Sequence, residues 1–209
     1  NRLWGTDAER LAMTTGGTNT AIGASAGTNL TTGAANTGAG YNSLGSNTTA
    51  NNNTGFGAYT LEDNTTGTAN VAVGAGALKN NTTASNNTAM GLDALMTNTT
   101  GTENTGMGVN TAYNITTGSY NSAFGSSCLS ACTTGAQNVA LGRAADQITT
   151  TGSYHVMLGS LAKPSSATVN SEIAIGYNVV GTGNSTFVFG GGTLDTVSYT
   201  HLRAHETVL

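Results

Sequence analysis

Residues 87–103 read NTAMGLDALMTNTTGTE, and this 17-residue unit decides the fold because the chain repeats it. The unit opens with the signature Asn87-Thr88-Ala89-Met90-Gly91, and the signature glycine recurs at a constant step of 17 residues. A stack of units tolerates no change of step length at its core, so a period kept through ten units predicts a solenoid. The ten glycines are Gly23, Gly40, Gly57, Gly74, Gly91, Gly108, Gly125, Gly142, Gly159 and Gly176.

The signature predicts a short strand with one bulky face and one small face. The position before each glycine is apolar throughout, and a mainly β-branched position two residues earlier shares its face by period-2 alternation. The residue between them is only Ala or Gly until Met157. We therefore expect the small face to line a narrow coil interior and the bulky face to meet something else. We call the bulky set the core column: Ile22, Phe56, Val73, Met90, Met107, Phe124, Leu141, Leu158 and Ile175, with Ala39 in the remaining unit.

The asparagine that opens each signature is predicted to have a structural role. Amides that stack at strand spacing can hydrogen-bond along a rod as a ladder. The predicted structural ladder is Asn19, Asn36, Asn53, Asn70, Asn87, Asn104, Asn121 and Asn138.

The rest of each unit predicts a second element and a corner. Pairs such as Ala94-Leu95 indicate a second short strand, and Asn98-Thr99-Thr100-Gly101 is typical of a turn. The high content of Gly, Asn and adjacent Thr excludes a propagating α-helix. The sequence thus predicts an all-β parallel β-solenoid of about ten 17-residue coils, which at roughly 4.8 Å a coil would be about 48 Å long.

Composition excludes several classes of protein. A chain of 209 residues with 30 Gly, one Pro and 8% charged residues is neither an ordinary globular domain nor a nucleic-acid binder. The longest apolar runs fall far short of the roughly 20 residues of a transmembrane helix, so we expect no membrane insertion. A net charge of −4 is too thinly spread to indicate anionic partners. The phased apolar columns argue against disorder.

The chain divides into four predicted regions. Residues 1–18 form a partial leading repeat, 19–180 the 17-residue repeats, and 181–196 a last shorter coil with the start of a truncated downstream region. Residues 197–207, VSYTHLRAHET, resemble the translation of a transposon-based sequencing adapter, so we treat 197–209 as not structural. We therefore discount His201 and His205, whose spacing imitates a metal site, and expect the natural protein to continue beyond residue 196.

No arrangement of residues indicates catalysis, and we predict no enzyme, no cofactor and no metal. The carboxylates lie in different columns, and the consecutive Glu62 and Asp63 would point opposite ways, so no glycosidase pair forms. Nucleophile-elbow, phosphate-loop and calcium-repeat motifs are missing from the sequence. His155 stands at a ladder position, where a polar substitution is favoured over a ligand. Cys128 is interpreted as a buried small residue, with a disulfide to Cys132 as the alternative.

These motifs carry a resemblance to a known group. The Asn-Thr-Ala-Ile-Gly signature at 19–23, the Ala-Leu pair and the Asn-Thr-Thr-Gly corner resemble the repeats of phage tail fibres and are similar to the head repeats of trimeric autotransporter adhesins. The resemblance covers about residues 15–192. In that group a related 14-residue unit builds a left-handed parallel β-roll with three chains side by side, so it implies a left-handed homotrimer. Residues 172–186 also resemble the segment before an endosialidase-type intramolecular chaperone, which would follow residue 196.

The resemblance implies a structural and adhesive rod segment of an extracellular surface fibre, on a phage tail or another host-attachment appendage. The alternative is an adhesin head on a bacterial cell. The expected partners are two further copies of the chain and a host-surface receptor or glycan. Burial of the core column between copies would also remove an apolar stripe that soluble monomers seldom expose.

Two other readings remain open. Regular threonine rows favour an ice-binding solenoid, although consecutive threonines should face opposite ways, unlike a flat Thr-x-Thr array. A carbohydrate-binding tip needs exposed aromatic rows, whereas the tyrosines are scattered over several columns. A shaft or adhesive body is therefore favoured over a tip.

Overall fold

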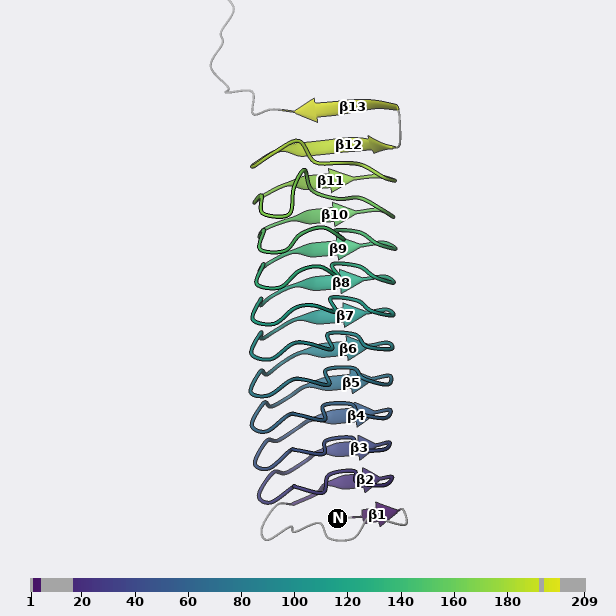
Figure 1. Cartoon of the computed structure of the whole chain (residues 1–209), viewed down its shortest axis with the longest axis vertical. Helices are drawn as coiled ribbons and strands as arrows, with labels where there is room; N and C mark the ends of the chain where they lie inside the picture. Colours follow the sequence, from purple (N-terminus) through teal and green to yellow (C-terminus); the bar gives the residue numbers. More distant parts are fainter. Residues whose placement is uncertain (1, 5–16, 192–193, 200–209) are drawn as a thin grey trace, which may run out of the picture.

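The computed structural model describes residues 2–4, 17–191 and 194–199, which form a parallel β-solenoid of about ten coils (Figure 1). Within these residues the fold is all-β and contains no helix, hence none that could cross a membrane. The strands are β1 (Arg2–Trp4), β2 (Thr20–Ile22), β3 (Thr37–Ala39), β4 (Thr54–Phe56), β5 (Val71–Val73), β6 (Thr88–Met90), β7 (Thr105–Met107), β8 (Ser122–Phe124), β9 (Val139–Leu141), β10 (Val156–Leu158), β11 (Ile173–Ile175), β12 (Phe187–Gly191) and β13 (Leu194–Tyr199).

The strands stack in sequence order into one sheet, as Figure 1 shows. β6 pairs in parallel with β7, so that Met90 lies beside Met107, one repeat further on. This shift of 17 residues holds from β2 to β11, and the pairing of Ile173 with Phe187 then shortens the step to 14. The constant repeat length therefore sets the register of the sheet.

The last strand of the sheet includes residues from the segment that we treat as not structural. β13 pairs antiparallel with β12, and its last residues are Val197, Ser198 and Tyr199, from the segment predicted to be not structural. His201 and His205 lie outside the described residues. So does most of the partial leading repeat 1–18, of which residues 2–4 form β1 and residues 17–18 are described.

Each coil has one strand, so the prediction of a second strand at the Ala-Leu pair is wrong. Leu95 lies in a turn, with a φ of 52°. Its N–H donates to the Thr111 carbonyl of the next coil at 2.9 Å, while its own carbonyl accepts from Asn98 N–H at 3.1 Å. The left-handed conformation costs a residue with a side chain about 1–2 kcal/mol, which burial of a leucine, worth about 1.5–3 kcal/mol, offsets.

The core lies between the strand and this turn. The inward strand residues, such as Ala89 and Ala123, contact the leucines of the turns in one continuous hydrophobic cluster. The leucine column of the turns, which we expected to form a minor strand, is thus the main apolar filling of the coil. Its fully buried members include Leu44, Leu61, Leu78, Leu95 and Leu129.

Candidate functional site: the outer strand face and the buried ladders

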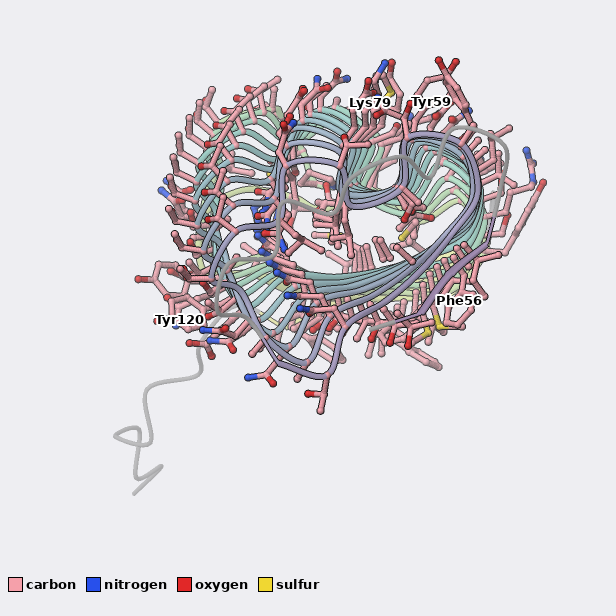
Figure 2. The ribbon with its side chains drawn as sticks, turned by 90° about the horizontal axis from the view of Figure 1, so that it is seen from below. Phe56, Tyr59, Lys79 and Tyr120 are labelled. Carbon is pink, nitrogen blue, oxygen red and sulfur yellow. The ribbon has the colours of Figure 1, made fainter. Side chains whose placement is uncertain are left out.

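The core column lies on the outside of the coil, so it is not the core of the single chain. Phe56 and Leu141 are 47% and 52% exposed, and Figure 2 shows Phe56 pointing away from the coil axis. The cause is local, because strand residues alternate and the Ala or Gly between the two bulky positions points inward. Ile22 and Met90 are also exposed, whereas Val73, Met107, Phe124, Leu158 and Ile175 are half-buried.

We call the core column and the β-branched column beside it the apolar face. Along β2–β11 its two columns contain Thr, Ser, Val, Ile, Ala, Phe, Met and Leu, and no titratable residue. Tyr41, Leu92 and Val109, which follow signature glycines, extend the exposed apolar surface. Such a surface offers no acid or base that could activate its Thr and Ser hydroxyls, and its exposed apolar side chains favour burial against another apolar surface.

The predicted ladder residues form a buried hydrogen-bonded column. Asn104 N–H donates to the Asn87 Oδ1 atom at 2.9 Å, and Asn87 N–H donates in the same way to Asn70 Oδ1 at 2.9 Å. The Asn87 Nδ2 atom also donates to the Gly101 carbonyl at 3.0 Å, across the coil. Each amide therefore links neighbouring coils and holds the corner against the strand. The same pattern joins all eight members, which are at most 2% exposed: Asn19, Asn36, Asn53, Asn70, Asn87, Asn104, Asn121 and Asn138.

A second amide ladder, which sequence reasoning assigned only to the turn, runs through the corner. Asn81 Nδ2 donates to Asn64 Oδ1 at 2.8 Å, and Asn98 Nδ2 donates to Asn81 Oδ1 at 3.1 Å. The same Nδ2 atom of Asn98 also donates to the Gly101 carbonyl at 2.8 Å. The recurrence of the Asn in the Asn-Thr-Thr-Gly corner at the 17-residue step was the signal that could have revealed it.

The first ladder changes character at its upper end, where buried ionisable residues replace amides. His155 keeps the backbone link, because its N–H donates to Asn138 Oδ1 at 3.0 Å. Its ring contacts the Val169 carbonyl through Nε2 at 2.9 Å and Asp146 Oδ2 through Nδ1 at 3.2 Å. Both contacts need a ring N–H, so they fit the doubly protonated imidazolium. Asp146 itself occupies the leucine column of the turns.

The charge state of His155 follows from its neighbours. Burial by itself lowers the pKa of His155, but the hydrogen bond and charge of Asp146, the Val169 carbonyl and the charge of Glu172 outweigh it, so the pKa is raised. Thr149 Oγ1 donates to Asp146 and lies 3.0 Å from His155 Nδ1. Asp146, Thr149, His155 and Glu172, here called the His155 cluster, are fully buried. A substrate therefore has no access to its hydroxyl or imidazole.

The His155 cluster marks a boundary in the core. Glu172 stands one repeat after His155, and its carboxylate accepts from the N–H groups of Ser165 and Gly183. The main hydrophobic cluster ends at Ala145, and a second one begins at Met157. The His155 cluster thus lies where the two hydrophobic clusters meet and extends into the coils of the second one.

The cysteines are free and buried, and no disulfide joins them. Burial raises the pKa of both the Cys128 and the Cys132 thiol to about 12, so neither is a thiolate at neutral pH. Among the described residues no group of three or more His, Cys, Asp or Glu side chains is placed to hold a metal ion.

Comparison of the chain with protein-family models, with curated proteins and with solved structures found no match.

Proposed function

We propose that this chain is a structural and adhesive rod segment of an extracellular surface fibre, assembled from three parallel copies. The observation that carries the proposal is the apolar face, which runs along β2–β11 and on which Phe56, Met90 and Leu141 are exposed. An apolar stripe of this length is unusual on a soluble monomer and indicates a contact surface.

A second copy of the chain is the partner that fits this face. Identical coils have the same step, so copies that lie in parallel present their apolar side chains at matching heights along the whole rod. A cyclic assembly of three copies closes these contacts and leaves no apolar face open. The sequence resemblance to phage tail-fibre repeats supports the same number of chains and the left-handed coil.

The setting that we favour is a phage tail fibre or another host-attachment appendage, and the alternative is the head of a bacterial trimeric adhesin. Both are extracellular and share this architecture. The charge-poor composition, the two amide ladders and the absence of a titratable group on the apolar face agree with a stiff scaffold rather than an enzyme.

The solution mass of the purified chain tests the proposal. Sedimentation equilibrium at micromolar concentration should give three times the mass of the chain. The double variant Phe124→Asn/Leu141→Asn should shift the assembly towards monomer, because each apolar side chain buried in the interface contributes about 1.5–3 kcal/mol.

A matched control replaces exposed residues away from the apolar face. Tyr120 and Tyr154 are more than half exposed. Figure 2 shows that Tyr120 and Phe56 lie on different sides of the coil. Tyr120→Asn/Tyr154→Asn should leave the mass unchanged. A wild-type chain that is monomeric at micromolar concentration would refute the trimeric fibre.

A second candidate, ice binding, is favoured by one observation, a continuous row of exposed threonines at the corner. Most corners contain two consecutive threonines, such as Thr99 and Thr100, of which the second is exposed. The first is half-buried and its hydroxyl bonds to the backbone: Thr99 Oγ1 donates to the Thr116 carbonyl at 3.0 Å. One threonine per coil therefore faces solvent here. Thermal hysteresis of the purified chain tests this candidate. The row is Thr32, Thr49, Thr66, Thr83, Thr100, Thr117, Thr134 and Thr151.

A further inference from the structure

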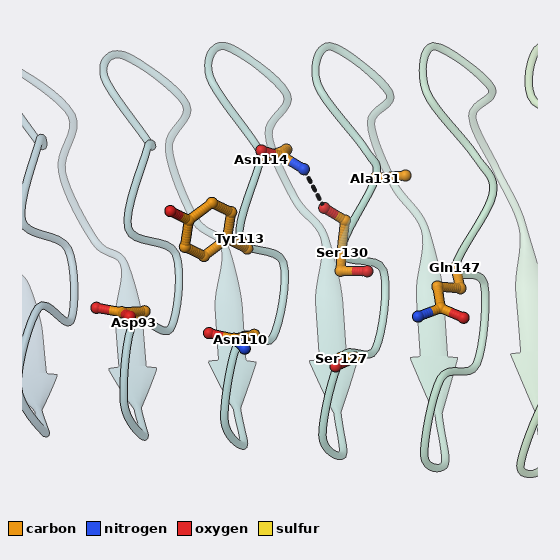
Figure 3. A pocket seen from close by; sticks show the side chains of 8 residues that line it. All are labelled: Asp93, Asn110, Tyr113, Asn114, Ser127, Ser130, Ala131 and Gln147. Atoms are coloured by element: carbon orange, nitrogen blue, oxygen red, sulfur yellow. Dashed lines mark hydrogen bonds between the residues drawn. The ribbon is translucent and has the colours of Figure 1, made fainter.

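A polar depression with a volume of about 550 Å³ lies on the surface of four successive coils (Figure 3). Asp93 comes from the first coil, Asn110 and Tyr113 from the second, Ser130 from the third and Gln147 from the fourth. Because neighbouring coils are roughly 4.8 Å apart, the depression extends about 14 Å along the rod.

The depression exists because two columns change from large to small side chains at one coil. The column that holds Lys79, Met96 and Tyr113 continues with Ser130, and the column of Asn114 continues with Ala131. Gln147 then restores a longer side chain in the fourth coil. Asp93 and Gln147 thus lie at the two ends of the depression, and the small residues lie between Tyr113 and Gln147, as Figure 3 shows.

The same columns are filled in earlier coils. Lys79 Nζ lies 5.2 Å from the centroid of the Tyr59 ring and 3.4 Å from a carboxylate oxygen of Glu62. Tyr59 and Glu62 belong to the columns of Asn110 and Tyr113, respectively. The hollow is therefore a local property of residues 93–147 and is not repeated with each coil.

The side chains that line the depression carry free hydrogen-bonding groups. Within the described residues, no hydrogen bond engages the side chain of Asp93, Asn110, Tyr113, Ser127, Ser130 or Gln147. The one bond drawn in Figure 3 joins Asn114 Nδ2 to the Ser130 carbonyl at 2.8 Å and leaves the Ser130 hydroxyl free.

We propose that this depression binds a neutral oligosaccharide that lies along the rod axis. Amide, hydroxyl and carboxylate groups match the donors and acceptors of sugar hydroxyls, and the Tyr113 ring offers an apolar face to a pyranose ring. A pyranose unit is about as long as the step between coils, so successive sugars meet equivalent positions on successive coils. No basic residue lines the depression, and the Asp93 carboxylate repels anionic sugars.

The site stays open in the assembly proposed above. Asn110 and Tyr113 belong to the columns of Tyr59 and Lys79, which Figure 2 shows on a different side of the coil from Phe56. Contact between copies through the apolar face would therefore leave the depression in solvent. This inference rests on the proposed adhesive function and gives it a class of ligand.

The test is binding of the purified full chain to an array of neutral oligosaccharides built from hexoses and N-acetylhexosamines, with sialylated and sulfated glycans beside them. Affinity for the best neutral binder is then measured by calorimetry for Tyr113→Ala and for Ser130→Tyr, which fills the hollow with the residue of the preceding coil. Both variants should lose about tenfold or more in affinity. The exposed control Tyr120→Ala should bind like the wild type.

Several outcomes would overturn the inference. They are no neutral oligosaccharide bound at millimolar concentration, binding confined to the anionic glycans, or unchanged affinity in the folded Ser130→Tyr variant. Circular dichroism establishes that each variant is folded. The mass of the same samples separates the two proposals, since a trimer that binds no sugar overturns only the site, and a monomer that binds sugar overturns only the fibre.

Discussion

Replacing Gly108 by alanine tests two separate demands that the stacked coil makes on its signature glycine. The backbone of Gly108 has a φ of +136°, which residues with a side chain rarely adopt. A Cβ atom there would also lie 2.6 Å from the carbonyl carbon and oxygen of Gly125 in the next coil. Backbone atoms of a paired coil cannot move aside without disturbing the stack.

The expected loss of stability is the sum of a backbone cost and a steric cost. A residue held in a sparsely populated backbone region costs about 1–3 kcal/mol. Overpacking a well-packed interior costs about another 1–3 kcal/mol. Gly108→Ala should therefore lower the free energy of unfolding by about 2–6 kcal/mol, measured by urea denaturation followed by circular dichroism.

Three further glycines separate the terms. Gly183 has a φ of +130° but no atom within 4 Å of an added Cβ, so Gly183→Ala should show only the backbone cost. Gly101 lies outside the left-handed region, and an added Cβ would meet the Gly118 carbonyl oxygen at 2.1 Å. Because Ala50 and Ala84 occupy the same column, the corner accommodates a methyl group, and Gly101→Ala should cost much less than Gly108→Ala. Gly17 has neither feature, and Gly17→Ala should change stability by less than about 0.5 kcal/mol.

The comparison of Gly108→Ala with Gly183→Ala decides whether close contact between neighbouring coils, in addition to the positive φ, requires glycine in the signature. If the two variants lose the same stability, close contact between signature glycines is not what requires glycine there. If Gly101→Ala loses as much stability as Gly108→Ala, the positive φ of the signature glycine adds no cost of its own.

Three further predictions concern the buried groups. Asn87→Ala should cost about 1–3 kcal/mol, seen in the urea midpoint, because it leaves the buried Asn104 N–H unpaired, whereas the Gly101 carbonyl still accepts from Asn98 Nδ2. Because the pKa of His155 is raised in the fold above its unfolded value of 6.5, its charged form stabilises the rod fully below that pH, and this contribution is lost as the pH rises through the folded pKa. His155→Asn/Asp146→Leu, which restores the amide and the leucine, should remove that loss from the pH dependence of melting. Cys128 and Cys132 should react with a thiol reagent at neutral pH only after unfolding, as followed by absorbance.

Each of these three predictions has a result that would contradict it. Asn80→Ala, a half-buried position off both ladders, is the control for the ladder variant and should be nearly neutral. An equal loss in both would remove the special role of the ladder. A double variant that keeps the full pH dependence would show that other groups cause it, and rapid labelling of the folded chain would refute the buried position of the thiols.

Much of the architecture could be predicted from residue types and spacing. The step of 17 residues, the position of strands β2–β11, the inward small residues and the first amide ladder depend on local alternation and on a repeat that is visible in the sequence. The second ladder was equally visible, but its asparagines are ordinary turn residues, and only the backbone shows that they stack.

The sites were less predictable, because their residues lie in different columns. Asp146 and His155 are nine positions apart and belong to the leucine and the ladder columns, so spacing alone did not indicate that they meet inside the coil. The depression from Asp93 to Gln147 likewise requires four coils to be stacked before the loss of side-chain volume at Ser130 becomes a hollow.

The sequence by itself determined that this chain is a stacked β structure with a fixed step, because identical units need identical surroundings and only stacking at a constant step provides them. Only the tertiary structure decided which apolar column fills the coil. The leucine turns point inward in a left-handed conformation that residue type disfavours, while the bulkier strand residues, such as Phe56 and Leu141, point outward. The physical reason is space: the strand and the turn of a narrow coil leave room between them for one column of large side chains, and alternation of the strand had already placed Ala and Gly on its inner side.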